Sequence, residues 1–185
     1  MKEYVELIIG GVGGQGVVTG GALLGKAAVE YAGLNAVASS EYGVETRGTF
    51  TKSSILISTG NIYYTEAVAP DLVIVMAEVA YEKYVETLKE ESLLVYDNSV
   101  IHKESPSDCE QIGFPITEAA REIGHEGVAN SIAAGIIIGL TQVMDKTIME
   151  QVLSDQFGSI ERVKEMNIKA FNKGYTMSTR RVARG

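Results

Sequence analysis

Short runs rich in apolar residues alternate with longer amphipathic stretches through the first half of the chain. The short runs occupy residues 4–9, 35–39, 72–76 and 92–96, and their length and composition predict buried strands of a parallel sheet. Residues 16–32 and 77–90 carry apolar positions at helical spacing, and Gly33 supplies a stop for the first of these helices. The pattern therefore predicts two strand–helix–strand units.

Residues 53–64 predict a departure from the parallel arrangement. Residues 53–58 and 62–64 are strand-like, and Gly60 between them suits the turn of an antiparallel hairpin. The sheet is therefore expected to be mixed. Residues 110–114 are a further strand candidate.

From residue 115 onward the periodicity is helical. Helices are expected at residues 117–123, 128–144, 147–157 and 163–173, and Thr147 and Glu150 have the spacing of a capping box. The expected fold class is α/β, a single three-layer α/β/α domain over residues 1–176 with a mostly parallel, mixed sheet and C-terminal helices. Residues 177–185 are expected to form a flexible basic tail.

The helix expected at residues 128–144 carries two features of interest. Ser131, Gly135 and Gly139 recur every four residues and leave a smooth face, which suits close packing on the sheet or a seam with another subunit. Asn130 lies in the same small, apolar stretch. It can be a hydrogen-bonded core residue or can face a ligand or partner.

Composition and charge make nucleic acid and membranes unexpected as partners. The 185 residues are 45% apolar with a formal net charge of −8, so the field of the protein repels polyanions and nucleic acid is not expected. Residues 128–144 include polar side chains and fall short of the roughly 20 apolar residues of a membrane span, so no membrane association is expected. The first residues lack a secretory signal pattern, which favours a cytoplasmic location.

The cysteine count limits redox chemistry. Cys109 is the single cysteine, so the chain can form no internal disulfide and cannot supply the thiolates of an iron–sulfur cluster. His102 and His125 are isolated and indicate no metal site. We expect any redox metal to be bound by another chain.

Glycines dominate the loop after the first strand. Gly11, Gly13 and Gly16 satisfy the GxGxxG dinucleotide fingerprint between a strand and a helix, and Gly14 adds a further glycine. Gly13 is expected at positive φ, where it would let another surface approach the backbone closely. Gln15 can contact a ligand or hold the carbonyls of the loop itself.

The fingerprint is incomplete in this sequence. It requires an acidic residue near the end of the second strand, but residues 36–39 have none, and Glu41 is expected in the loop beyond. A stand-alone NAD- or FAD-binding oxidoreductase is therefore one reading, and a loop that merely permits a tight turn is another. A helix N-terminus contributes only about 0.3–1 kcal/mol toward an exposed anion, so a charged clamp or a partner is needed.

Residues 41–48 are a candidate for that clamp. Arg47 can anchor a phosphate or a neighbouring subunit, or can simply pair with Glu41 or Glu45. Tyr42 and Gly48 complete the segment, whose residues can contact a neighbouring subunit or lie in a solvated loop.

Four segments together resemble one known family. They are Gly-Val-Gly-Gly-Gln-Gly at 11–16, Glu-Tyr-Gly-Val-Glu-Thr-Arg-Gly at 41–48, Ala-Pro-Asp-Leu-Val-Ile-Val at 69–75 and Gly-Val-Ala-Asn-Ser at 127–131. In order and spacing they resemble the gamma subunit of 2-oxoacid:ferredoxin oxidoreductases, with the 2-oxoglutarate type nearest and the pyruvate and branched-chain types next. Thr49 departs from the Arg-Gly-Gly that is usual in the family.

The resemblance implies a non-catalytic subunit of a cytoplasmic complex that converts a 2-oxoacid to an acyl-coenzyme A and passes electrons to ferredoxin. Thiamine diphosphate, Mg²⁺ and the iron–sulfur clusters would be held by alpha and beta chains or a ferredoxin-like delta chain. The glycine loop and the Arg47 segment would dock onto alpha and beta and border the coenzyme A site. A related indolepyruvate oxidoreductase subunit is an alternative.

Overall fold

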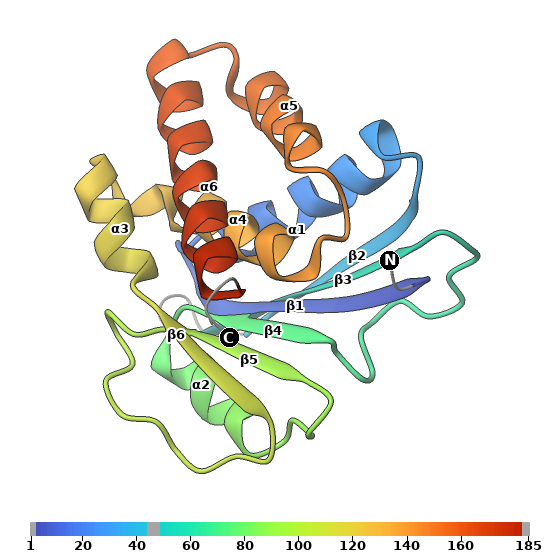
Figure 1. Cartoon of the computed structure of the whole chain (residues 1–185), viewed down its shortest axis with the longest axis vertical. Coiled ribbons are helices and arrows are strands. Elements are labelled where there is room, and N and C mark those ends of the chain that lie inside the picture. Colours follow the sequence, from blue (N-terminus) through green and yellow to red (C-terminus); the bar gives the residue numbers. More distant parts are fainter. Residues whose placement is uncertain (1–2, 44–48, 183–185) are drawn as a thin grey trace.

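The computed structural model describes residues 3–43 and 49–182, which form a sheet with helices on both faces (Figure 1). In chain order the elements are β1 (Tyr4–Val12), α1 (Val17–Lys26), a π-helical turn (Ala27–Tyr31), β2 (Asn35–Tyr42), β3 (Phe50–Ser58), β4 (Leu72–Val75), α2 (Glu78–Val85), β5 (Leu93–Asp97), β6 (Glu110–Phe114), α3 (Ile116–Ile123), a 3₁₀ turn (Glu126–Val128), α4 (Ala129–Thr141), α5 (Lys146–Phe157) and α6 (Glu161–Val182).

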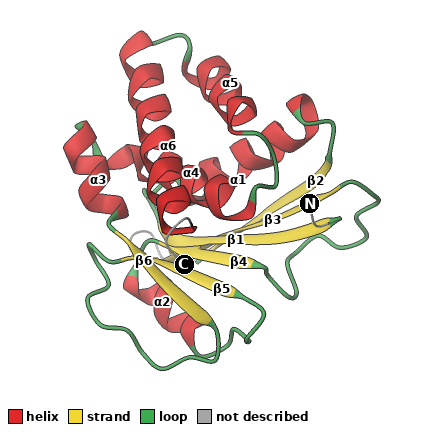
Figure 2. Ribbon diagram, viewed as in Figure 1, coloured by secondary structure: helices red, strands yellow, loops and turns green. Residues whose placement is uncertain are grey.

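The six strands are ordered β2-β3-β1-β4-β5-β6 (Figure 2). β4 is parallel to β1, and β5 and β6 continue the parallel arrangement. β3 is antiparallel to both of its neighbours, β1 and β2. The predicted mixed sheet is confirmed, as is the second strand–helix–strand unit, in which α2 connects the adjacent parallel strands β4 and β5.

Two strand predictions are wrong in detail. The hairpin expected around Gly60 does not form, because residues 62–64 are not a strand and β3 pairs with β2 and β1 instead. In the first strand–helix–strand unit, β1 and β2 run parallel but are not neighbours, because β3 lies between them. A local apolar pattern indicates that a strand exists but carries little information on which strand it pairs with.

The helices form two unequal layers. Figure 1 shows α1, α4, α5 and α6 on one face of the sheet and α2 on the other, which confirms the three-layer prediction. The larger core lies on the first side, where β1 residues such as Leu7 and Ile9 pack with helical residues such as Leu24 and Ile137. The smaller core joins Ile8 and other strand residues to α2.

The small residues of α4 face α6 rather than the sheet. A Cβ added to Gly135 would overlap the carbonyl oxygen of Phe171, and one added to Gly139 would overlap the hydroxyl of Ser178, both on α6. Ser131 donates a hydrogen bond from Oγ to Oδ1 of Asn167 at 2.7 Å. The expected close approach is present, but its partner is a helix of the same chain.

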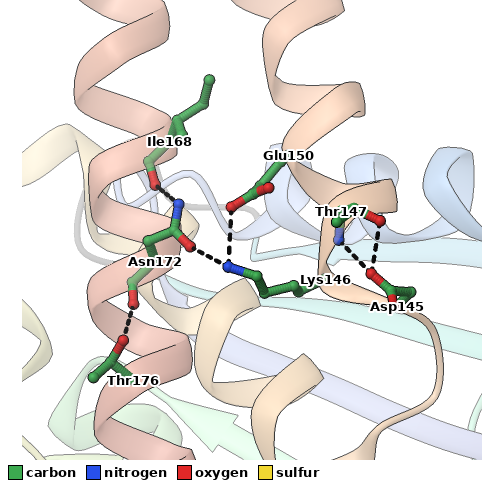
Figure 3. A network of polar contacts seen from close by, with 7 residues as sticks. All are labelled: Asp145, Lys146, Thr147, Glu150, Ile168, Asn172 and Thr176. Atoms are coloured by element: carbon green, nitrogen blue, oxygen red, sulfur yellow. Dashed lines mark hydrogen bonds and ion pairs between the residues drawn. The ribbon is translucent and has the colours of Figure 1, made fainter.

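The C-terminal helices differ from their predictions at their ends. The N-cap of α5 is Asp145, whose carboxylate accepts the Thr147 amide at 2.8 Å, so Thr147 is inside the helix and the predicted capping box is wrong. Lys146, the first residue of α5, connects this helix to α6, because its Nζ donates to Oδ1 of Asn172 at 3.2 Å (Figure 3). The same Nζ lies 3.4 Å from the carboxylate of Glu150 within α5. α6 continues to Val182, so residues 177–182 are helical where a flexible tail was expected.

Candidate functional site

The glycine loop lies at the carboxyl ends of β1 and β4. β1 extends to Val12, so Gly11 belongs to the strand and the loop proper is shorter than the sequence pattern suggests. From β1 the chain crosses over α1 toward the β2 edge, whereas from β4 it crosses over α2 toward the β6 edge. Such a change of direction leaves a crevice at the strand ends, where open α/β sheets bind their ligands.

The loop glycines have distinct conformations. Gly14 has φ 95° and Gly16 has φ 70°, both in the region that favours glycine, whereas the expected positive φ at Gly13 is wrong. A Cβ added to Gly13 or Gly14 would meet nothing within 4 Å among the described residues. The tip of the loop is therefore bare backbone, open to close approach by another surface.

Gln15 fixes the shape of this loop. Its Oε1 accepts the amide of Val12 at 2.9 Å, and its Nε2 donates to the carbonyl oxygen of Met76, just after β4, at 2.8 Å. A Cβ on Gly11 would lie 2.5 Å from the same Oε1, so Gly11 leaves the room that Gln15 needs to fold back. Gln15 therefore holds the loop, but through the amide of Val12 and the carbonyl of Met76 rather than through carbonyls of the loop itself, as was expected.

Asn130 supports the loop from α4. It is 6% exposed, and its Nδ2 donates to the carbonyl oxygen of Gly16 at 3.4 Å, a long hydrogen bond. A Cβ on Gly16 would lie 2.6 Å from that nitrogen. The structure thus brings Asn130 to the predicted site, 114 residues away in sequence, as a packing and hydrogen-bonding support.

A cavity of about 580 Å³ opens beside the loop. Gly14, Gly16 and Asn130 line it together with His125, which precedes α4, and Arg162 in the first turn of α6. Its volume is in the range of small-molecule sites, and an α-helix N-terminus together with a guanidinium favours an anion. Neither His125 nor Arg162 was predicted as a site residue, since three separate helices must come together before either reaches the loop.

Glu41 and Tyr42 lie in β2 and not in the loop where Glu41 was expected. The Glu41 carboxylate pairs with Nζ of Lys52 on β3 at 3.2 Å, and Lys52 also pairs with Glu66 at 3.0 Å. Burial lowers the pKa of Lys52, but its hydrogen bonds to the two carboxylates outweigh this and raise the pKa. Tyr42 lines a smaller hollow of about 280 Å³ together with Gly13 and Gly14 of the glycine loop. Glu45, Arg47 and Gly48 lie outside the described residues.

The strand order argues against the hypothesis that the chain binds NAD or FAD through a dinucleotide fingerprint. The fingerprint places its acidic residue on the strand next to β1, but β3 occupies that place and β2 lies one strand further away. Neighbouring strands are about 4.8 Å apart, so Glu41 lies one such spacing away from where the fingerprint places the acidic residue that binds the ribose. The fold therefore differs from the dinucleotide-binding one at the residue that would select the cofactor.

Over the described ranges, 3–43 and 49–182, no group of three or more His, Cys, Asp or Glu side chains is arranged to hold a metal ion. In the same ranges no helix is both long and apolar enough to cross a bilayer.

Comparison with known proteins agrees with this architecture. Residues 6–177 match the family model described as pyruvate ferredoxin/flavodoxin oxidoreductase. The chain is 32% identical over 181 residues to the 2-oxoglutarate synthase subunit KorC of Methanocaldococcus jannaschii, covering 96% of each chain.

Solved structures give the same result. The gamma subunit of a keto/oxoacid ferredoxin oxidoreductase from Geobacter sulfurreducens superposes with a TM-score of 0.82 at 32% identity, over 94% of this chain and 98% of that one. The 2-oxoglutarate:ferredoxin oxidoreductase of Magnetococcus marinus shares the fold, with a TM-score of 0.88 at 23% identity over 97% of this chain and 32% of that one.

Fold and relatives together define a class, the small α/β subunits or domains of 2-oxoacid oxidoreductases. The chain belongs to the pyruvate ferredoxin/flavodoxin oxidoreductase family, which confirms the resemblance found in the sequence.

Proposed function

We propose that this chain is the gamma subunit of a 2-oxoacid:ferredoxin oxidoreductase, most like the 2-oxoglutarate type. In the complex, a 2-oxoacid is oxidatively decarboxylated, its acyl group is transferred to coenzyme A, and two electrons pass to ferredoxin. Thiamine diphosphate, Mg²⁺ and iron–sulfur clusters supply that chemistry on alpha and beta chains, with a ferredoxin-like delta chain in some complexes. The relatives named as subunits of 2-oxoglutarate, pyruvate and ketoisovalerate oxidoreductases support this assignment.

One observation carries the role of this chain in particular. The loop at the end of β1 is rigidly held by Gln15 and Asn130, yet Gly13 and Gly14 at its tip present backbone without side chains. A fixed, bare loop suits close contact with another molecule better than it suits catalysis by its own groups. We assign this edge of the sheet to docking against alpha and beta.

The cavity beside the loop supports a contact with coenzyme A. Coenzyme A carries a diphosphate and an extended, less polar arm, and the cavity combines Arg162 and the start of α1 with apolar walls from Phe157 and Met166. At about 580 Å³ the cavity takes only part of such a ligand, so we place it at the border of a site completed by the partner chains.

Reconstitution with alpha and beta chains tests the docking role. We expect Gly13→Val to leave the fold intact, because a Cβ at this position would meet no described atom within 4 Å and φ is not positive, but the new side chain covers the bare tip. We expect weaker assembly or a higher KM for coenzyme A, with Arg47→Ala acting in the same direction. Gly60→Val is the matched control, because Gly60 also has room for a side chain but follows β3 at its C-terminal end.

Unchanged assembly and unchanged kinetics in the Gly13 variant would refute the docking role. Titration of the purified chain with NAD(H), FAD and coenzyme A tests the rival reading, since micromolar dinucleotide binding by the chain alone would favour a stand-alone oxidoreductase. Identifying the chains that co-purify from native cells distinguishes the 2-oxoglutarate type from the indolepyruvate type.

A further inference from the structure

The two edges of the sheet are protected to different degrees. β6 forms one edge with five residues, and its Gln111 is tied to the preceding loop, donating to the carbonyl oxygen of Ser105 at 2.9 Å and accepting from the Tyr81 hydroxyl at 2.7 Å. β2 forms the other edge with eight residues. An edge strand leaves a row of backbone groups without strand partners, which is a template for pairing with another chain.

β2 lacks the features that prevent such pairing. Its sequence, Asn-Ala-Val-Ala-Ser-Ser-Glu-Tyr, contains no proline, lysine or arginine, and its register with β3 runs from Asn35 to Tyr42 without a bulge. Glu41 is its one charged residue, and its carboxylate pairs with Lys52 on β3, which it shares with Glu66. The central side chains are small, so they do not hold a second strand away.

Exposed apolar side chains border the same edge. Val29 is 51% exposed on the π-helical turn, which packs on β2, and Tyr31 on the same turn is 37% exposed, with its hydroxyl donating to the carboxylate of Asp155 on α5. Tyr42 at the far end of β2 is 68% exposed. Apolar exposure beside an open strand marks an interaction surface, because burying it on association is favourable.

We propose that β2 pairs antiparallel with β2 of a second copy of this chain and so joins the two six-stranded sheets into one. A two-fold axis perpendicular to the sheet keeps each face on its own side, so every residue must lie opposite a residue of the same face. With Ala38 on the axis, Val37 lies opposite Ser39 and Asn35 lies opposite Glu41.

This alignment makes the edge complementary to itself. The Asn35 side chain donates one amide hydrogen to the carbonyl oxygen of Gly60 at 2.9 Å, and its second amide hydrogen is available to the carboxylate of the copy. No like charges face each other, and alanine meets alanine at the centre. On the helical side, the π-helical turns of the two copies bring their exposed apolar residues to the same interface.

Charge pairing at residue 38 is the sharpest test. We expect sedimentation equilibrium of the full chain to give about twice the monomer mass of 19.9 kDa, and Ala38→Lys or Ala38→Glu alone to give the monomer mass, because like charges then meet on the axis. An equimolar mixture of the two variants is expected to recover the dimer. Val79→Lys adds the same charge on α2, and this control is expected to remain dimeric.

A second measurement does not depend on charged variants folding. Ala38→Cys places two thiols across the axis within the Cα separation that a disulfide needs, so mild oxidation should cross-link the chain. Cys109 is buried and is not expected to compete. A wild-type chain that stays monomeric, or a dimer that survives both charged variants, overturns the proposal. If Ala38→Lys instead releases a different subunit from the reconstituted complex, the edge binds that subunit and the self-pairing is equally refuted.

Discussion

Two features require glycine at position 16, a left-handed backbone and a close neighbouring side chain, and the other loop glycines have one of these features or neither. Its φ of 70° lies in the left-handed region, and a Cβ on it would press on the side-chain nitrogen of Asn130. Gly14 shares the left-handed backbone at φ 95° but has open space around it, and Gly13 has open space without positive φ among the described residues. Three glycines that look equivalent in the sequence therefore differ in what they do.

Alanine substitutions at these three glycines are expected to separate the two constraints. Gly13→Ala should change the free energy of unfolding by less than about 0.5 kcal/mol. Gly14→Ala should lower it by about 1–2 kcal/mol through the left-handed backbone, and Gly16→Ala should lower it further because Asn130 must also move. Urea unfolding measures all three, and equal losses at Gly14 and Gly16 would contradict the contact with Asn130.

The sequence could identify the loop residues and name Gln15 and Asn130 as candidates, but not the contacts that these two side chains make. The glycine pattern predicts a turn between a strand and a helix, and that turn is present. The contacts of Gln15 with Met76 and of Asn130 with Gly16 span 61 and 114 residues, so no local pattern encodes them. The same is true of Arg162, which reaches the cavity because α6 begins next to the loop.

At the scale of elements, the close contact of α4 with α6 depends on glycines in both helices. Gly135 of α4 faces the backbone of α6 near Phe171, and Gly174 of α6 faces the backbone of α4 at Ile132. The spacing of small residues predicts a close approach but does not say to what, which is why the sheet appeared a suitable partner. The partner is α6, a helix of 22 residues whose Phe171, Tyr175 and Ser178 lie along the small residues of α4.

Gly135→Ala and Gly174→Ala are expected to be strongly destabilising, by about 3 kcal/mol or more, since each methyl group would meet backbone that cannot rotate away. Gly25→Ala is the matched control, also inside a helix, where the new Cβ lies 3.4 Å from that of Ala38, an ordinary contact. It should be neutral or stabilise by up to about 1 kcal/mol through helix propensity. Thermal and urea unfolding compare the three, and a tolerated Gly174→Ala would show that the helices can separate.

At the scale of the whole molecule, the order of the strands is the feature that the sequence could not supply. The two strand–helix–strand patterns are equally clear, yet one connects adjacent strands and the other encloses β3. β3 follows β2 in the chain and pairs antiparallel with both β2 and β1. Because β3 lies between these two strands, β2 is at the edge of the sheet. The glycine loop still lies between the carboxyl ends of β1 and β4, where the chain changes direction, but Glu41 lies one strand further from β1 than in a dinucleotide-binding fold.

Residues 177–182 are expected to belong to the folded structure rather than to a dispensable tail. Ser178 is fully buried, and its hydroxyl lies where a side chain on Gly139 would be. Phe171, about two helical turns earlier on α6, is also fully buried. Truncation after Thr176 removes that contact and the last turns of α6, and we expect the free energy of unfolding to fall by about 1–3 kcal/mol. Truncation after Val182 leaves α6 entire and is the control. If both truncated chains unfold at the same urea concentration as the full chain, the last turns of α6 contribute no stability, and the domain ends at residue 176 as its sequence suggested.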